Sequence, residues 1–581
     1  MKVQKKNCQD TSIIRFAEEE LCRYFEKMFQ DDISENTEII LVLEAAGFRY
    51  DGYEVTEKAR QKIQVRACTE RGLLHGVYAL LKELGCNFLF PGRQREQIPE
   101  HGSWPRFDRI AIRREPWLEY RGLCLYNTVK KTEQKTLDAL DWMAKNGFNF
   151  LMSSIHREDD TGCGEYGHAI LWDEIGKKMM PELKKRGIVL DMSEHSTNYY
   201  FPSEKLFEQH PEWFALVNGK RAPGQICYSN PDAVEAYGNA LADFARENGG
   251  FEFMGIWPLD GGGYCECEKC SDPQTIFKAN VKIAAKIRKV RPELTVEHLA
   301  YTPQSFARPK EKMPDNMCVL VCSVRDKIAY EWVLASKEAG GAFYFDYMTA
   351  DHYRYRANVV MNPIYCREMV NMLAGYGFRG AVSLYLPVDC WFQASLNLWY
   401  LSELYYDPMQ PLQKLHRKLA LQLFGKEVLE EGGLVLKEIG ESLSDGCLWS
   451  GYSHAYDWYC EHITGRSSEL DRIHAERFDE VCGQILAVLS GMEADAGKEY
   501  QKNIVRMKQY VELQELYYHG VDLFDADRDT PERAEPYFKR LSELEKENDA
   551  PFISEEYARW RITGRDSIFD PEKTNQFQAQ A

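Results

Sequence analysis

Eight short strand patterns, each followed by a helix pattern, alternate between about residues 117 and 405. Short apolar runs are typical of parallel strands that are buried on both faces. Eight such units in about 290 residues match the count and length of a (β/α)₈, or TIM, barrel. A doubly wound open sheet is the alternative, but no Gly-rich phosphate-binding loop follows the first strand. The predicted strands are Tyr120–Leu125, Phe148–Met152, Ile188–Met192, Phe253–Trp257, Thr295–Tyr301, Cys318–Cys322, Ala342–Tyr347 and Gly380–Tyr385.

Different patterns flank this central stretch. Residues 1–108 alternate strand and helix patterns and predict a small, non-catalytic α/β domain, whereas residues 409–581 form amphipathic helices with charged outer faces. We therefore expect three domains, with a catalytic barrel over residues 109–408. The flanking elements are predicted at Ile39–Glu44, Tyr53–Thr56, Gln61–Ala67, Glu70–Leu84, Leu412–Leu423, Glu427–Ile439, Leu470–Leu489 and Glu499–Tyr517. The clearest barrel helices are predicted at Glu133–Asn146, Leu171–Arg186, Asp232–Glu247, Thr275–Val290, Pro363–Tyr376 and Trp391–Leu404.

Charge and cysteine content restrict the partners of the chain. The net charge of −18 argues against a nucleic-acid partner, because a phosphate backbone requires a basic patch. No run of 18 or more apolar residues predicts a membrane span. The N-terminus lacks the apolar region of an export signal, so the 17 cysteines indicate reduced thiols and a cytoplasmic location. The oligomeric state is left open.

The active site of a TIM barrel lies at the carboxyl ends of its strands. Asp260 follows the fourth predicted strand and precedes three glycines, which let the backbone approach a ligand closely. The alternative is that Asp260 has a purely structural role and caps the following loop or helix. Glu194 follows the third strand, where a carboxyl group in a cleft can act as a general acid. We expect Asp260 and Glu194 to be catalytic. The register leaves open whether Glu297 points inward. Substrate-binding side chains are expected at His195, Tyr301, Arg325, Asp346, Tyr347 and Trp391.

Cys265, Cys267 and Cys270 have the spacing C-x-C-x-x-C, and Cys227 lies upstream. Four thiols can close a tetrahedral zinc site. The spacing differs from the usual pair of C-x₂-C knuckles, so reduced structural thiols are our expectation and structural zinc is the alternative. We expect no catalytic metal and no cofactor.

Several longer segments are more specific than any single residue. The first two lie in the small domain, the third begins the first barrel strand, and the others surround the fourth. They are RGLLHGVYALL (71–81), FPG (90–92), YRGL (120–123), HPEWFALVNGKR (210–221), CYSNP (227–231) and WPLDGGGYCECEKC (257–270).

Together these segments resemble the family known as domain of unknown function 4838, which overlaps glycoside hydrolase family 163. They also resemble the barrel glycosidases of family 20, the hexosaminidases, and family 67, the α-glucuronidases. The resemblance covers about residues 35–405. Because family 163 members are endo-β-N-acetylglucosaminidases, it implies a glycoside hydrolase that acts on oligosaccharides at β-linked N-acetylglucosamine. The small domain then resembles the non-catalytic domain that precedes family 20 and 67 barrels.

One departure from family 20 affects the catalytic assignment. Those enzymes place adjacent Asp and Glu residues after strand 4, but here Asp260 is followed by Gly261. Either Asp260, as the acid, works with a carboxylate from another strand, or the acetamido mechanism is not used. Glu194 is the expected partner, with Asp346 as its rival. A carbohydrate-binding or degenerate barrel without turnover, and a zinc enzyme using the cysteines, are the alternative functions. The linkage and stereochemistry stay open.

Overall fold

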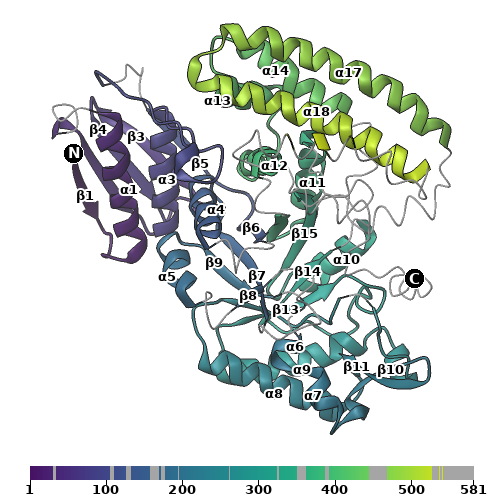
Figure 1. Cartoon of the computed structure of the whole chain (residues 1–581). Coiled ribbons are helices and arrows are strands. Elements are labelled where there is room, and N and C mark those ends of the chain that lie inside the picture. Colours follow the sequence, from purple (N-terminus) through teal and green to yellow (C-terminus); the bar gives the residue numbers. More distant parts are fainter. Residues whose placement is uncertain are drawn as a thin grey trace.

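Eight parallel strands close into a barrel at the centre of the molecule (Figure 1). The computed structural model describes residues 1–29, 35–104, 110–125, 133–156, 169–171, 177–193, 195, 197–260, 262–322, 326–349, 361–385, 391–443, 468–526, 536, 539–540 and 543. Strand β6 pairs with both β7 and β16, which closes the ring. This confirms the predicted TIM barrel. The strands are β6 (Tyr120–Leu125), β7 (Phe150–His156), β9 (Val189–Met192), β12 (Phe253–Gly255), β13 (Thr295–Ala300), β14 (Met317–Val321), β15 (Ala342–Thr349) and β16 (Gly380–Tyr385).

Helices cover the outside of the barrel, as the amphipathic patterns predict. Among the predicted barrel helices, Leu171–Arg186 differs most from the expectation. Leu171 belongs to a short strand, β8 (Ala169–Leu171), which pairs with the end of β7, and the helix begins later. A hairpin of β10 (Phe214–Val217) and β11 (Lys220–Ile226) is inserted between β9 and β12. The helices are α4 (Glu133–Lys145), α5 (Lys177–Lys185), α6 (Thr197–Tyr200), α7 (Ser203–Phe207), α8 (Pro231–Glu247), α9 (Thr275–Val290), α10 (Asp326–Ser336), α11 (Pro363–Tyr376) and α12 (Trp391–Leu404).

Four aromatic rings fill the amino end of the barrel. Tyr120, Phe150, Phe253 and Phe343 come from four strands, and their ring centroids lie 5.2–5.5 Å apart. Aromatic side chains bury a large apolar area at such contacts. The interior of the barrel is therefore closed at this end by aromatic core packing.

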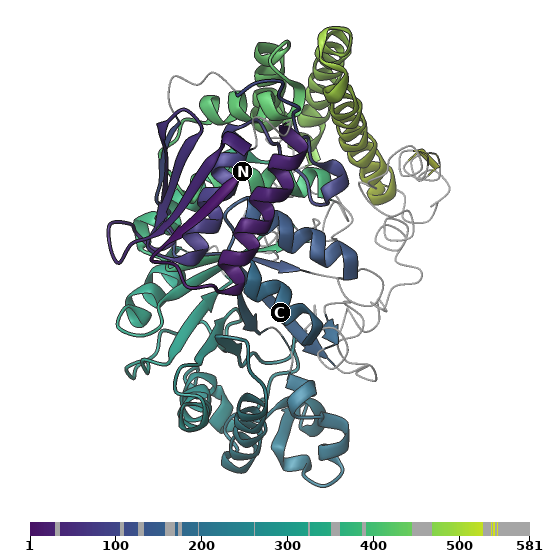
Figure 2. The same ribbon diagram turned by 90° about the vertical axis from the view of Figure 1, so that its left-hand side faces the viewer.

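The N-terminal domain is a five-stranded sheet of order β1-β2-β4-β3-β5, with two helices (Figures 1 and 2). Its edge strand β5 pairs antiparallel with β3 and lies beyond residue 108, so the sheet extends past the expected domain boundary. The elements are β1 (Lys2–Lys6), α1 (Ser12–Met28), β2 (Glu38–Leu43), β3 (Tyr53–Ala59), β4 (Lys62–Ala67), α3 (Glu70–Glu83) and β5 (Ala111–Arg114).

A buried ion cluster joins this domain to the barrel. Asp51 accepts a hydrogen bond from Nη2 of Arg121 on β6 at 2.5 Å, and Arg71 and His75 lie within 3.5 Å of the same carboxylate oxygen. Burial opposes the charge of Asp51, but these neighbours hold its pKa well below the usual range. Burial lowers the pKa of His75 to about 3. The interface thus depends on a neutral His75 and an ionised Asp51.

The C-terminal part is helical, as predicted. Helices α17 and α18 lie side by side at the top of Figure 1 and pack against α13 and α14. Within the described part of the chain, no helix combines the length and the apolar character needed to cross a membrane. The helices are α13 (Leu412–Phe424), α14 (Leu429–Glu438), α17 (Ser468–Asp495) and α18 (Lys498–Ala526).

Candidate active site

Polar side chains gather inside the barrel where β9, β12 and β13 end. Side chains alternate between the two faces of a strand. On β13, Leu299 lies in the barrel interior while Val296 and Ala300 pack against the outer helices, so Glu297 points inward. On β9, Leu190 and Met192 pack outward, so Asp191 also points inward. Both carboxyl groups are fully buried.

Hydrogen bonds connect this carboxyl pair to its neighbours. Oε1 of Glu297 accepts a hydrogen bond from Nε1 of Trp257 at 2.8 Å, and the Ser193 hydroxyl donates to Asp191. Burial, followed by the negative charge of Asp191, raises the pKa of Glu297 well above its usual value, and the hydrogen bonds from Trp257 and Ser193 oppose this. The pair therefore retains a proton to higher pH than free carboxyl groups would.

Gly255 leaves space for this cluster. A Cβ atom at this position would lie 2.6 Å from Oγ of Ser193 and 2.8 Å from Nε1 of Trp257. Both distances are shorter than a van der Waals contact. A glycine is thus required at the end of β12, because the side chains of Ser193 and Trp257 occupy the space that a Cβ atom would take.

Trp257 also links the buried pair to the mouth of the barrel. Its indole ring lies edge-on to His195 with a centroid distance of 5.2 Å, and Nδ1 of His195 lies 2.5 Å from the carbonyl oxygen of Pro258. The ring of half-buried Tyr301 lies 6.2 Å from that of His195. Two of the predicted substrate-binding residues, His195 and Tyr301, are therefore brought together.

Asp260 is exposed on the loop that continues from β12. Gln225, on β11, fixes this loop: its side chain donates to the carbonyl oxygens of Leu259 and Gly262 and accepts from the Leu259 amide. Burial mainly raises the pKa of Tyr264 to about 12, and the nearby charge of Asp260 contributes. The hydroxyl of Thr302, just beyond β13, donates a 3.3 Å hydrogen bond to the hydroxyl of Tyr264. The carboxylate of Asp260 thus lies at the same end of the barrel as His195 and Tyr301.

Asp346, another predicted contact, points away from the barrel interior. The Ser383 hydroxyl donates to Asp346 at 2.6 Å on the outer face of the barrel, since the interior positions of β15 are Phe343 and Phe345. The alternation of β15 in the pleat explains this orientation. It argues against both expectations for Asp346, as a substrate contact and as the rival partner of Asp260.

Trp391 is only 3% exposed. It packs against Phe90, which lies in the segment between α3 and β5, and the guanidinium groups of Arg95 and Arg506 lie 4.4 and 5.0 Å from its ring. These contacts leave no ring face open for a sugar. The position of Trp391 at the first turn of α12, where neighbouring segments converge on it, therefore argues against the expected subsite.

The remaining predicted residues lie outside what the structure describes. Glu194 and Arg325 are not among the described residues, and Tyr347 is described only through its backbone in β15. Sequence reasoning missed Asp191 and the role of Trp257. The signal for Asp191 was its charge within the otherwise apolar run Ile188–Met192, since a buried carboxyl group without a function or a partner is costly.

Among the described residues, Cys227, Cys265, Cys267 and Cys270 form the group whose side chains could hold a metal ion. They lie on the segment after β11 and on the continuation of the Asp260 loop. All of the described cysteines are free of disulfide bonds.

Solved structures share this architecture. A family GH115 4-O-methyl-α-glucuronidase is 11% identical, with a TM-score of 0.67 over 99% of this chain and 79% of that chain. A family 89 glycoside hydrolase from Clostridium perfringens, in complex with 2-acetamido-1,2-dideoxynojirmycin, is 12% identical, with a TM-score of 0.59 over 93% and 66%. The β-N-acetylhexosaminidase from Bacteroides fragilis is 11% identical, with a TM-score of 0.51 over 72% and 90%.

These identities are low, so the likeness concerns the fold. No curated protein sequence matches the chain. The resemblance predicted from the sequence is confirmed for the segment that begins before the barrel and ends after α10: residues 90–338 match the family model described as domain of unknown function (DUF4838).

Proposed function

We propose that the chain is a glycoside hydrolase whose active site lies at the carboxyl ends of β9, β12 and β13. The observation that carries this proposal is the position of exposed Asp260 at the end of the barrel where His195 and Tyr301 meet above a buried carboxyl pair. Active sites of TIM-barrel enzymes lie at this end. The likeness to solved glycosidase barrels supports the same class of reaction.

In the proposed reaction Asp260 is the general acid. A glycosidic oxygen is a poor leaving group until it receives a proton. A second carboxylate must stabilise the positive charge that develops on the sugar, attack the sugar carbon, or activate a water molecule that attacks it. Glu194 is the proposed partner. Its chain neighbour Ser193 donates to Asp191, and its other neighbour, His195, contacts the backbone two residues before Asp260.

The buried cluster has a positioning role in this proposal. Glu297 is enclosed in the barrel and meets Trp257, whose carbonyl oxygen accepts a 2.7 Å hydrogen bond from Thr197. These contacts hold the ends of β9 and β12, from which His195 and Asp260 project. A site fixed in this way loses little free energy to reorganisation during the reaction. His195 and Tyr301 are proposed to bind sugar hydroxyls and a sugar face.

For the substrate we propose an oligosaccharide cleaved at β-linked N-acetylglucosamine. One neighbour is named a β-N-acetylhexosaminidase, and another is bound to a 2-acetamido sugar mimic, which supports a sugar with an acetamido group. Because Asp260 has no adjacent acidic residue, an acetamido group would have to be oriented by a carboxylate from another strand.

The experiment is a screen of the purified chain against aryl glycosides of different sugars and against N-glycan fragments. Turnover of N-acetylglucosaminides by the unaltered chain, with turnover of the N-glycan fragments lost in Asp260→Asn, supports the proposal. The control is Asp315→Asn, an exposed aspartate that pairs with Arg288 at the amino end of β14. Saturable sugar binding without turnover on any substrate would instead favour a carbohydrate-binding barrel and contradict the enzyme.

A further inference from the structure

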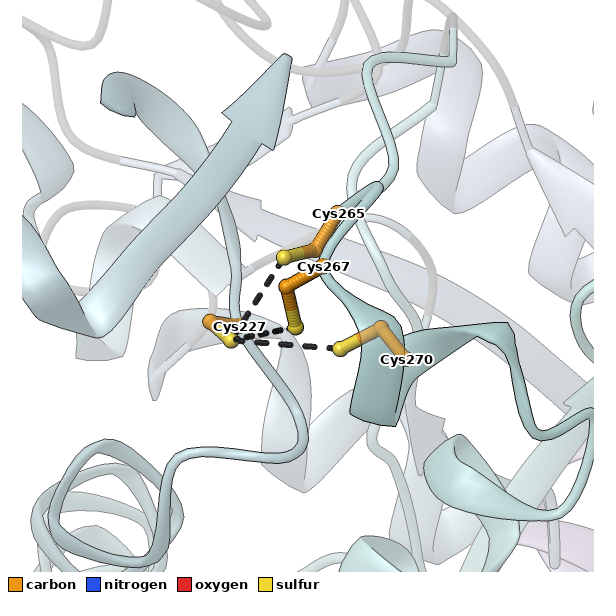
Figure 3. Close-up of side chains that lie close together, drawn as sticks. All are labelled: Cys227, Cys265, Cys267 and Cys270. Atoms are coloured by element: carbon orange, nitrogen blue, oxygen red, sulfur yellow. Dashed lines mark hydrogen bonds between the residues drawn. The ribbon is translucent and has the colours of Figure 1, made fainter. Parts of the chain in front are cut away.

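Four cysteine sulfurs converge beside the Asp260 loop (Figure 3). Cys227 follows β11, whereas Cys265, Cys267 and Cys270 lie in and before a single 3₁₀ turn, Glu268–Ser271. The four Sγ atoms all lie within 4.8 Å of one another. The sulfur of Cys227 lies 3.5, 3.9 and 3.8 Å from those of Cys265, Cys267 and Cys270.

These distances are too long for disulfide bonds and match the separation between sulfur ligands in a tetrahedral metal site. A disulfide joins its sulfurs at about 2.05 Å. A Zn–S bond of about 2.3 Å in tetrahedral geometry places neighbouring sulfurs about 3.8 Å apart. The three distances from Cys227 fall within a few tenths of an ångström of that value. Four thiolates in a tetrahedron are the ligands typical of zinc or an iron–sulfur centre.

Nearby polar groups are suited to a cluster of thiolates. The backbone amide of Leu216 donates to Sγ of Cys265 at 3.3 Å, and Nη1 of Arg221 lies 3.6 Å from the same sulfur. The hydroxyl of Ser229 lies 3.3 Å from Sγ of Cys267. Donors around a metal site orient its ligands and offset their negative charge. All three groups come from the β10–β11 insertion or the segment just after it.

The segment that carries three of the cysteines has little else to hold it. From Gly262 to Ser271 no residue is fully buried, and Tyr264 is the one side chain of this stretch that packs against the barrel core, so the stretch has little apolar core of its own. A structural metal supplies folding free energy where burial does not. The stretch begins two residues after Asp260, and Gln225, two residues before Cys227, holds Leu259 and Gly262.

We propose that Cys227, Cys265, Cys267 and Cys270 bind one structural Zn²⁺ ion that ties the β10–β11 insertion to the loop carrying Asp260. With four protein ligands the coordination is closed, so the ion has no position for water and takes no part in bond cleavage. Its effect on activity is indirect, through the placement of the Asp260 loop.

The first test measures metal in the full-length chain purified without added metal, by inductively coupled plasma mass spectrometry. We expect one zinc per chain, released when a chelator and a thiol-modifying reagent are added. Replacement of zinc by Co²⁺ should give the visible absorption of a tetrahedral thiolate complex. Iron with acid-labile sulfide, or no metal and no uptake of added Zn²⁺ by the folded chain, would overturn the proposal.

Matched variants locate the ion. Cys267→Ser and Cys270→Ser should each lower the zinc content several-fold, whereas Cys68→Ser, a half-buried cysteine of the N-terminal domain, should leave it unchanged. Where a cluster variant does not fold, chelator release from the unaltered chain still decides the question. Zinc content is measured without substrate, so a zinc-loaded but inactive chain would contradict the proposed hydrolase and not the metal site.

Discussion

The indole Nε1 of Trp257 donates a 2.8 Å hydrogen bond to Oε1 of Glu297 inside the barrel. Trp257 lies three residues before Asp260, so this bond fixes the point from which the Asp260 loop leaves β12. The bond also satisfies one oxygen of a carboxyl group that has no access to solvent. One buried contact therefore serves both the stability of the barrel and the geometry of its mouth.

The raised pKa of Glu297 makes the stability of the fold decrease as the pH rises. Above the ordinary value of 4.5 the unfolded chain has lost this proton while the folded chain keeps it, so stability falls as the pH rises towards the folded pKa. Glu297→Gln retains an acceptor for Trp257 and removes the titration. We expect the free energy of unfolding, measured with urea across pH, to fall less steeply in this variant. Glu293→Gln, an exposed neighbour just before β13, should keep the slope of the unaltered chain.

Gly255→Ala should damage the site from within. The new methyl group would meet Ser193 and Trp257 at less than 3 Å, so we expect a loss of roughly 1–3 kcal/mol and a displaced Trp257. Thermal unfolding and tryptophan fluorescence measure the two effects. Gly433→Ala on α14, where nothing lies within 4 Å, is the control and should be neutral or stabilising. Equal behaviour of the two variants would contradict the packing described at Gly255.

Acid should weaken the interface between the N-terminal domain and the barrel. The pKa of His75 is lowered from 6.5 to about 3, so the unfolded chain binds a proton in this range that the folded chain does not. Stability is complete above the unfolded value and is lost as the pH falls, by about 2 kcal/mol between pH 7 and pH 5. His75→Leu should reduce this slope in urea unfolding, whereas His210→Gln, at an exposed histidine, should not. An unchanged slope in His75→Leu would show that His75 is not buried neutral.

Tyr301 is the aromatic residue that we propose to line the sugar subsite. Its half-buried ring lies beside His195, where it can stack on a sugar. We expect Tyr301→Ala to raise KM roughly threefold to tenfold with a smaller effect on kcat, because an aromatic contact contributes about 0.5–1.5 kcal/mol. Tyr330→Ala, at an exposed tyrosine of α10, is the matched control. If both variants have the KM of the unaltered chain, Tyr301 does not contact substrate.

The periodicity of apolar residues in the sequence was enough to predict most of the barrel. The bounds of β6 and β16 agree with the sequence prediction, because short apolar runs between helices indicate buried parallel strands. Helix α1 was not predicted: its charged run Glu18–Glu20 conceals an apolar face that includes Leu21, Tyr24 and Phe25. The β10–β11 hairpin was also missed, since it interrupts the strand–helix alternation.

The site was predicted less completely because it depends on register and on contacts distant in sequence. The position of a strand end is visible in the sequence, and it placed His195, Tyr301 and Asp260. The sequence does not show on which face of a strand a side chain lies. Asp346 was therefore expected to face the substrate, and the direction of Glu297 could not be decided. The burial of Trp391 beside Arg95 and Arg506 joins three distant segments.

The most direct measurement compares the kcat/KM of Asp260→Asn with that of the unaltered chain on two substrates. If Asp260 is the acid, a natural N-acetylglucosamine disaccharide should react roughly 10²–10⁴-fold more slowly. A dinitrophenyl glycoside, whose leaving group needs no proton, should lose far less, whereas Glu194→Gln should slow both. Full activity of Asp260→Asn on both substrates would contradict the account.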